Sequence, residues 1–412
     1  MRRVGILVLA AGVLVGTTSA VAAAKPKTRL VSKTSQGQAG DDTSVEARIS
    51  NDGRYVVFQS QADNLPGPDD VQGIHVHDRK TKKTRLVSRT SSGQPALGQN
   101  RNPDISGNGR FVVFESDASN LPGNGFQVYV RDLKTKKTRL ASRNSAGQPA
   151  DASGLSGRIS DSGRFVTFSS MAGNLPAGGG PLSKLYIHDR KTRKTRLLSK
   201  SSNGTPVSAG LHALSASGRF AAFTSSDPAL PGPSTFRVYV RDRKTKKTRL
   251  VSKRSSGVPF DEFASWVDIS GSGRVVVFSL NIEFNEICDR VDIHARDRKT
   301  KKTRLVSRTT AGAAADGCNQ WPAISGNSRY VAFHSNAPNL PGASPPIARS
   351  YVHDRKRRTT RVLSKTTAGT VVTGAGPGLS WTGEWATFVS NEAALPGPNT
   401  GVFQVYVRGP LR

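Results

Sequence analysis

Short apolar runs separated by turn-forming residues recur along the whole chain, and no long stretch has the 3.6-residue apolar period of a helix. The run Tyr55-Val56-Val57-Phe58 is apolar at every position, which is typical of a strand buried on both faces. It follows the turn Asn51-Asp52-Gly53, where glycine readily takes a positive φ. This pattern predicts an all-β protein with many short strands.

Three motifs recur in fixed order, seven times each. The first is TRLVS or a close variant, the second resembles IS-x-x-GR-x-V-x-F, and the third resembles VYVRD. Their period of roughly 53–57 residues is the size of one four-stranded propeller blade. The first motif begins at Thr28, Thr84, Thr138, Thr195, Thr248, Thr303 and Thr360, and the second begins at Ile49, Ile105, Ile159, Leu214, Ile269, Ile324 and Leu379.

The first complete repeat predicts four strands, at 45–50, 54–60, 74–78 and 84–88. The fourth strand is the most polar and carries Arg and Lys, as an outer edge strand does when it resists edge-to-edge association. We therefore expect one blade per repeat, with the fourth strand outermost.

The repeat is cut within a blade, because a fourth-strand motif (27–32) comes first and a third-strand motif (405–408) comes last. Pairing of these two strands would complete a seventh blade and remove two open edges. We predict a single seven-bladed β-propeller over residues 25–412, with the last blade closed by the N-terminal strand.

The segments ISNDGRYVVF (49–58), NLPG (64–67) and VYVRD (128–132) together resemble the repeats of bacterial exported TolB-like and WD-repeat-like propellers. The resemblance covers residues 27–408 and implies a propeller that acts as a binding scaffold. TolB itself is usually six-bladed with a separate N-terminal domain, so seven repeats argue against a direct equivalent. The chain also departs from the pattern in the loop of blade five (281–288), at Ser328, and at Trp381 to Glu384.

Residues 1–24 have the features of a secretory signal peptide. Arg2 and Arg3 precede an apolar run from Val4 to Gly16, and small residues follow at 20–24. The run is too short to span a bilayer comfortably, although an uncleaved anchor is the alternative. A secreted or cell-envelope location is therefore expected.

The chain has two cysteines, Cys288 and Cys318. An exported chain favours a disulfide between such a pair. In a propeller both would lie in neighbouring loops on the same face, so we predict that they are bonded.

The distribution of basic residues matters more than the formal net charge of +31. In a propeller, the one-to-two and three-to-four turns share one face (the turn face), and a large share of the 60 Lys and Arg falls there. This predicts binding of a polyanion, such as an anionic cell-wall polymer, acidic polysaccharide, nucleic acid or anionic membrane. The alternative is that a duplicated basic hairpin only keeps the protein soluble. The candidate residues are Lys80, Lys82, Lys83, Lys136, Lys137, Lys246, Lys247, Lys301 and Lys302.

Two details refine this prediction. A cation occupies the fourth turn residue where related repeats often have glycine, which costs on the order of 1 kcal/mol if φ is positive. No aromatic residue lies between the Lys and Arg of these turns, so base stacking on this face is not expected.

The opposite face (the loop face) has a different composition. Trp266 and Trp321 occupy equivalent places in neighbouring repeats, and Asp261, Glu262 and His212 lie in nearby loops. These residues form a candidate ligand face for a glycan or protein. The alternative is that the two tryptophans pack between blades.

No catalytic or metal-binding motif is present in the sequence, and no cofactor is expected. The recurrent aspartates at Asp78 and its equivalents precede turns, where we expect them to accept backbone hydrogen bonds. Asp261, Glu262, Asp104 and Asp268 are the carboxylates available for an acid/base pair. We expect a monomeric, non-enzymatic binding scaffold, with a carbohydrate-active hydrolase or lyase as the alternative.

Overall fold

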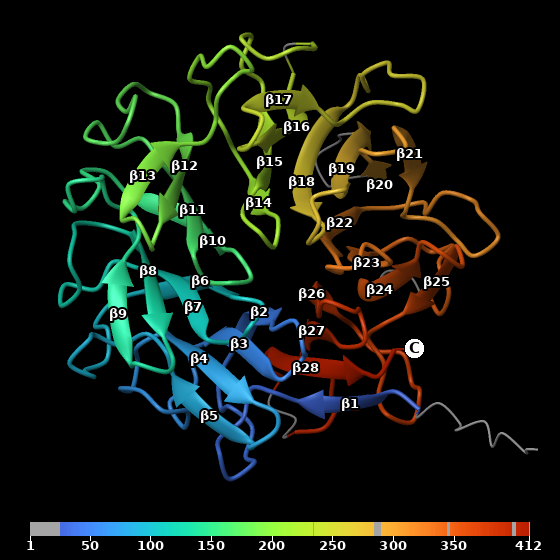
Figure 1. Cartoon of the computed structure of the whole chain (residues 1–412). Coiled ribbons are helices and arrows are strands. Elements are labelled where there is room, and N and C mark those ends of the chain that lie inside the picture. The colour runs from blue at the N-terminus through green and yellow to red at the C-terminus, as the bar shows by residue number, and fades with distance from the viewer. Residues whose placement is uncertain (1–24, 234, 284–289, 344–346, 398–400, 412) are drawn as a thin grey trace, which may run out of the picture.

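The computed structural model describes residues 25–233, 235–283, 290–343, 347–397 and 401–411. Its strands form seven four-stranded antiparallel sheets, arranged as blades around a common axis (Figure 1). No helix in the described residues is long and apolar enough to cross a membrane. The predicted seven-bladed, all-β propeller is confirmed.

Each blade uses its strands in chain order from the axis outward. Blade one has β2 (Ser44–Ile49), β3 (Tyr55–Ser60), β4 (Gly73–Asp78) and β5 (Lys83–Leu86); blade two has β6 (Asn100–Ile105), β7 (Phe111–Ser116), β8 (Gln127–Asp132) and β9 (Lys137–Leu140); blade three has β10 (Gly154–Ile159), β11 (Phe165–Ser170), β12 (Lys184–Asp189) and β13 (Lys194–Leu197). Blade four has β14 (His212–Leu214), β15 (Phe220–Ser225), β16 (Arg237–Asp242) and β17 (Lys247–Leu250); blade five has β18 (Phe263–Ile269), β19 (Val275–Glu283), β20 (Arg290–Asp297) and β21 (Lys302–Leu305); blade six has β22 (Asn319–Ile324), β23 (Tyr330–Ser335), β24 (Arg349–Asp354) and β25 (Thr359–Val362).

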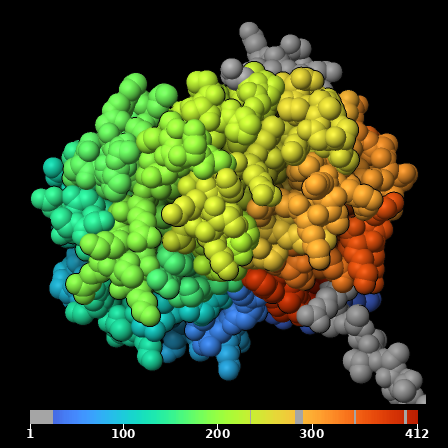
Figure 2. Space-filling model, turned by 45° about the horizontal axis from the view of Figure 1, so that its top comes forward, coloured from blue at the N-terminus to red at the C-terminus, as the bar shows by residue number. Residues whose placement is uncertain are grey.

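Blade seven is built from both ends of the propeller. It comprises β26 (Ala375–Leu379), β27 (Ala386–Ser390), β28 (Gln404–Gly409) and β1 (Lys27–Leu30). β1 pairs with β28 so that Lys27 lies opposite Gly409 and Leu30 opposite Tyr406 (Figure 1). Beyond the strand, the Val31 N–H donates to the Val405 carbonyl at 2.8 Å. The predicted closure is confirmed, and the earliest and latest parts of the ring adjoin in the space-filling view (Figure 2).

The hydrophobic core is divided among the blade interfaces. One cluster, for example, joins Val57 and Ile74 of blade one to Val112 and Phe114 of blade two. Within every blade, an aromatic residue of the second strand packs against a ring of the third, as Phe114 does against Tyr129 at 5.7 Å. Each blade therefore buries its faces on its neighbours, as repeat architectures require.

The turn-face end of the axis is closed by the one-to-two turns. Main-chain hydrogen bonds link each turn to the next around the ring: Asn51 to Gly107, Asn108 to Asp161, Asp161 to Ala216, Ala216 to Gly271, Gly271 to Gly326, Asn327 to Trp381, and Trp381 to Asn51.

Two side-chain contacts fill this end of the axis. The Trp381 indole lies against Gly271 and Gly326, where a Cβ atom would come within 2.2 and 2.1 Å of the ring. The Asn51 side-chain amide donates to Asp161 at 2.6 Å, joining blades one and three. An aromatic ring and a hydrogen-bonded pair thus occupy the turn-face end of the axis.

Candidate functional site

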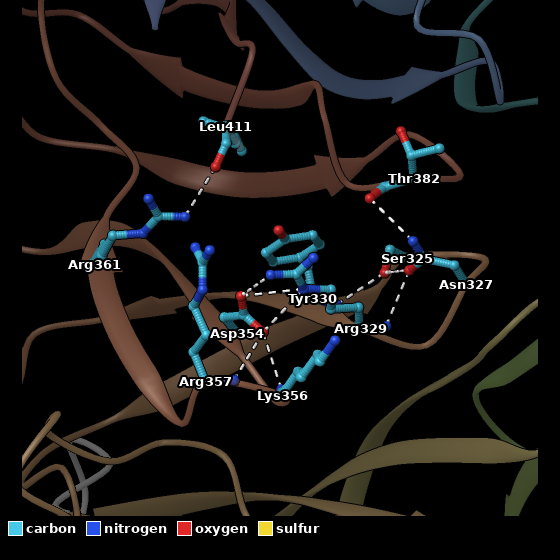
Figure 3. Close-up of polar contacts among 10 residues, drawn as sticks. All are labelled: Ser325, Asn327, Arg329, Tyr330, Asp354, Lys356, Arg357, Arg361, Thr382 and Leu411. Atoms are coloured by element: carbon cyan, nitrogen blue, oxygen red, sulfur yellow. Dashed lines mark hydrogen bonds and ion pairs between the residues drawn. The ribbon is translucent and has the colours of Figure 1, made fainter. Parts of the chain in front are cut away.

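An arginine–aspartate pair anchors the three-to-four hairpin in each of the first six blades. In blade two, Arg110 Nε and Nη2 donate to the Asp132 carboxylate at 2.9 and 2.6 Å. Figure 3 shows the same pair in blade six, where the Lys356 N–H also donates to Asp354. The pairs are Arg54–Asp78, Arg110–Asp132, Arg164–Asp189, Arg219–Asp242, Arg274–Asp297 and Arg329–Asp354.

These pairs change the predicted charge of the turn face. The hydrogen bonds from Arg54 hold the pKa of Asp78 well below its usual range, so the carboxylate is ionised at neutral pH. The predicted acceptance of backbone hydrogen bonds is confirmed, since the Lys80 N–H donates to Asp78 at 3.0 Å. The arginines of the one-to-two turns, predicted as part of the basic face, are therefore neutralised. On the turn face, the positive charge without an acidic partner in the described structure is therefore concentrated in the hairpins and the outer strands.

No aromatic residue lies within these turns, as the sequence indicates, but rings of neighbouring blades contact some of their arginines. The Arg190 guanidinium lies 4.2 Å from the centre of the Phe111 ring of the preceding blade, and Arg110 flanks the same ring at 4.8 Å. Arg243 and Arg298 contact Phe165 and Phe220 in the same way. The contact crosses from one blade to the next, so spacing within a single turn did not reveal it. Because guanidinium groups cover these rings, they stabilise blade packing and are not available to stack on bases.

The exposed cations of the six hairpins and outer strands form what we call the basic rim, which comprises the Lys and Arg of residues 80–85, 134–139, 191–196, 244–249, 299–304 and 356–361. In the outer strands the Lys and Arg are exposed, while the alternating Thr and Leu face inward. Every ion pair found among the described residues involves an arginine outside the rim. The rim thus presents the nine candidate lysines without acidic partners in the described structure.

One cation in each hairpin has a left-handed backbone conformation. Lys136 has a φ of 56° and Lys301 a φ of 60°, a region that glycine occupies without strain. The strain costs on the order of 1 kcal/mol per site. The other residues in this position are Lys82, Arg193, Lys246 and Arg358. The fold therefore tolerates a repeated local cost at positions that each add a cation to the rim.

On the loop face, the structure brings Trp266 and Trp321 together. Their rings meet edge to face with centroids 6.1 Å apart, and each side chain remains more than a third exposed. Trp321 also lies 4.9 Å from the ring of His334. The pair is accessible on the surface of blades five and six.

The other predicted members of the ligand face do not join this pair. The carboxylates of Asp261 and Glu262 lie 3.9 and 3.8 Å from Arg254, at the approach to β18. His212 is buried, and its Nε2 lies 3.1 Å from Thr167 Oγ1 between blades three and four. Burial lowers the pKa of His212 to about 3, so the ring is neutral and acts in packing. Its assignment to the ligand face was wrong, because the first strand begins inside the blade interface.

Sequence reasoning missed Glu115, a fully buried carboxylate in β7. Glu115 accepts hydrogen bonds from the Ser156 N–H at 2.5 Å and from the Asn102 side chain at 3.0 Å, and Arg101 lies 3.3 Å away. It therefore fixes the first strands of blades two and three on the loop face. The sequence signal that could have identified Glu115 is its charge directly after the apolar run of the segment FVVFES (111–116).

The loop face also has an acidic groove between blades one and two. It has a volume of about 600 Å³, and its lining includes Asp42, Asp63, Asp70 and Asp117. In the described chain no three His, Cys, Asp or Glu side chains are grouped closely enough to hold a metal ion. The groove makes the loop face electrostatically unlike the turn face.

Two predictions fall partly or wholly outside the described residues. The predicted signal peptide, residues 1–24, is one of them. The other is the disulfide, because Cys288 is not described. Cys318 lies in a parallel bridge with Val291 at the start of β20. The disulfide remains a prediction.

By sequence, the chain matches no protein-family model and no curated protein. By structure, it matches an oligogalacturonate lyase in complex with manganese, with a TM-score of 0.59 and 12% identity over 94% of this chain and 97% of that one. The β-propeller domain of the Trilobed protease from Pyrococcus furiosus matches with a TM-score of 0.56 and 12% identity, covering 89% and 95% of the two chains. A structure described as a putative TolB from Agrobacterium tumefaciens matches with a TM-score of 0.45 and 15% identity, covering 82% of this chain and 97% of that one. At these identities the likeness concerns the fold alone.

Proposed function

We propose that this propeller is an exported, non-enzymatic binding scaffold that holds an anionic polymer of the cell envelope on its basic rim. The observation that carries the proposal is the sixfold repetition of exposed cations without acidic partners in the described structure. A flexible polyanion can contact several hairpins at once, and each contact releases counterions. The acidic groove keeps such a polymer off the loop face.

Catalysis is not part of this proposal. The solved oligogalacturonate lyase was in complex with manganese, whereas the described residues of this chain group no set of side chains suited to a metal ion. Of the carboxylates available for an acid/base pair, Asp104 and Asp268 each accept two main-chain hydrogen bonds. Turnover of any substrate in a panel of acidic polysaccharides would contradict the proposal.

The test is retention on a heparin column as the salt concentration rises. The purified protein should elute well above about 0.15 M salt, the physiological ionic strength. Reversing Lys136, Lys137, Lys246 and Lys247 to Glu should move elution to lower salt and flatten the salt dependence by about one unit per lost contact. Lys184→Glu is the matched control, because Lys184 begins β12 away from the rim and should leave elution nearly unchanged. Elution of the unaltered protein below physiological salt would contradict the proposal.

A further inference from the structure

Four charged side chains from four blades face the propeller axis at one level. Arg48, Asp104, Arg158 and Asp268 occupy the same register position in the first strands of blades one, two, three and five. Arg48 interacts electrostatically with the other three, and Asp268 interacts with both arginines. Side chains of non-neighbouring blades can meet only at the axis, so we call these four residues the axial ring.

The axial ring is accessible to water from one side. All four side chains are partly exposed although they lie inside the ring of blades. The equivalent positions in the remaining blades carry the small residues Ala213, Ala323 and Gly378. Because Trp381 and the Asn51–Asp161 contact occupy the turn-face end, we infer that a ligand would reach the axial ring from the loop face.

The two carboxylates of the axial ring are already used by the fold. Asp104 accepts from the Ile105 N–H at 3.0 Å and from the Ile159 N–H of the next blade at 2.9 Å. Asp268 accepts in the same way from Ile269 and Ile324, at 2.8 Å each. These bonds join blades two to three and five to six and fix both aspartates as hydrogen-bond acceptors.

The two arginines, in contrast, use only some of their N–H donors in the hydrogen bonds that the structure shows. Arg48 Nη1 donates to the Ala47 carbonyl at 3.1 Å, and Arg158 Nη1 donates to the Gly157 carbonyl at 2.9 Å. Neither forms an ion pair in the part of the chain that the structure describes. A guanidinium group has five N–H donors, so each arginine can still bind an anion through two parallel hydrogen bonds. Burial, followed by the nearby charge of Arg158, lowers the pKa of Arg48, and an anion between the two would relieve their repulsion.

The entrance to the axis has two unlike halves. Two residues before each axial position, blades four, five and six place the exposed side chains of Leu211, Trp266 and Trp321. Blades one to three place Glu46, Asn102 and Ser156 there, the last two held by Glu115. Apolar rings facing a few fixed polar groups are typical of sites for small polar ligands.

We propose that the propeller axis binds one saccharide end group that carries a carboxylate or a phosphate. The group enters from the loop face, its anion pairs with Arg48 and Arg158, and its sugar ring lies against Trp266 and Trp321. This site is separate from the basic rim, so it can exist whether or not the rim binds a polymer.

The experiment is a titration of the full protein with glucuronate, glucose 6-phosphate and glucose. Binding is measured by calorimetry and by tryptophan fluorescence. At least one of the two anionic sugars should bind saturably at one site, and comparison of the two separates carboxylate from phosphate. Glucose and the neutral methyl ester of glucuronate should bind at least about tenfold more weakly, a difference of 1.4 kcal/mol. The ester tests the role of the anion in the unaltered protein and so does not depend on the folding of any variant.

Variants locate the site. Arg48→Gln/Arg158→Gln should raise the Kd at least about tenfold. The melting temperature of this variant is measured beside the Kd, because the two arginines also balance the charges of Asp104 and Asp268. Lys136→Glu/Lys137→Glu, on the rim, should leave the Kd unchanged. The proposal fails if neither anionic sugar binds saturably, if glucose binds as tightly, or if the double arginine variant folds and binds with unaltered affinity.

Discussion

The basic rim and the axial ring carry charge in opposite ways. The rim copies one hairpin around six blades and presents exposed cations without acidic partners in the described structure. The strand position of the axial ring carries Arg, Asp, Arg, Ala, Asp, Ala and Gly in blades one to seven, so only four blades contribute to the ring, and their charges balance. A repeated site matches a repeated ligand such as a polymer. A ring without repetition has one unique arrangement and matches a single asymmetric ligand.

The largest expected effect comes from opening the ring. Deleting residues 25–33 removes β1 and exposes the edge of β28 together with the pocket of Leu30 and Val31. We expect the free energy of unfolding to fall by more than about 4 kcal/mol, from lost burial and strand pairing. Chemical denaturation followed by fluorescence measures this loss.

The same deletion separates the two regions. The axial ring depends on a closed ring of blades, whereas each rim hairpin depends mainly on its own blade. Binding of the anionic sugar should therefore be lost under conditions where heparin retention persists. An unchanged melting temperature would contradict the closure.

A smaller effect is expected from the arginine–aspartate pair that anchors each rim hairpin. Asp132→Ala removes two hydrogen bonds from Arg110 and two from the Lys134 and Thr135 N–H groups, and should lower stability by about 2 kcal/mol. The control is Asp69→Ala, at an exposed aspartate in the loop between β3 and β4. It should change the melting temperature little, and equal losses in both variants would contradict the role assigned to the pair.

The left-handed cations of the rim predict a conflict between stability and binding. Lys136→Gly should raise the free energy of unfolding by up to about 1 kcal/mol, because glycine takes a positive φ without strain. It should also move heparin elution to lower salt. Lys137→Gly, in the adjacent strand, removes the same charge but should lower stability, as glycine does inside strands. Destabilisation by both would show that the left-handed position carries no strain.

The smallest effect is a difference in pH response. Burial raises the pKa of Asp268 to about 6, so its contribution to stability is greatest in acid and is lost as the pH rises through 6. Hydrogen bonds from Arg54 lower the pKa of Asp78, so its contribution is present above its unfolded pKa of about 4 and is lost as the pH falls below it. An NMR titration of the two carboxylates should show Asp268 titrating near pH 6 while Asp78 stays ionised. Titration of Asp268 near pH 4 would contradict the desolvation of this carboxylate at the axis.

The strands and the ring closure could be predicted from the sequence because both depend on local pattern. Apolar runs such as Tyr55 to Phe58 recur with turn residues around them, and the cut of the repeat determines which strands pair. The anchoring pair could also have been found. Only the seventh repeat lacks the Arg of the one-to-two turn, and the same repeat lacks the Asp of the third strand. This joint absence is the sequence signal of a contact between the two positions.

The axial ring could not be predicted by the same reasoning. Bulges such as that between Val45 and Arg48 place two residues opposite one and shift the alternation of faces, so a period-two pattern misassigns the inward residue. The sequence identified Asp104 and Asp268 only as carboxylates available for an acid/base pair. Their position at the axis depends on the assembled ring. The position of His212 also depends on the assembled ring. The first strand of blade four is shorter, and this places His212 inside the blade interface.

The seam in blade seven also sets an order of events during synthesis. β1 is made first and then has no partner until residues 404–409 emerge. Six blades, with their rim hairpins, can form one after another as the chain lengthens, but the arc that they make stays open. The nascent protein can therefore acquire polyanion contacts gradually, whereas the axial ring is completed in one step, when the last strand meets the first.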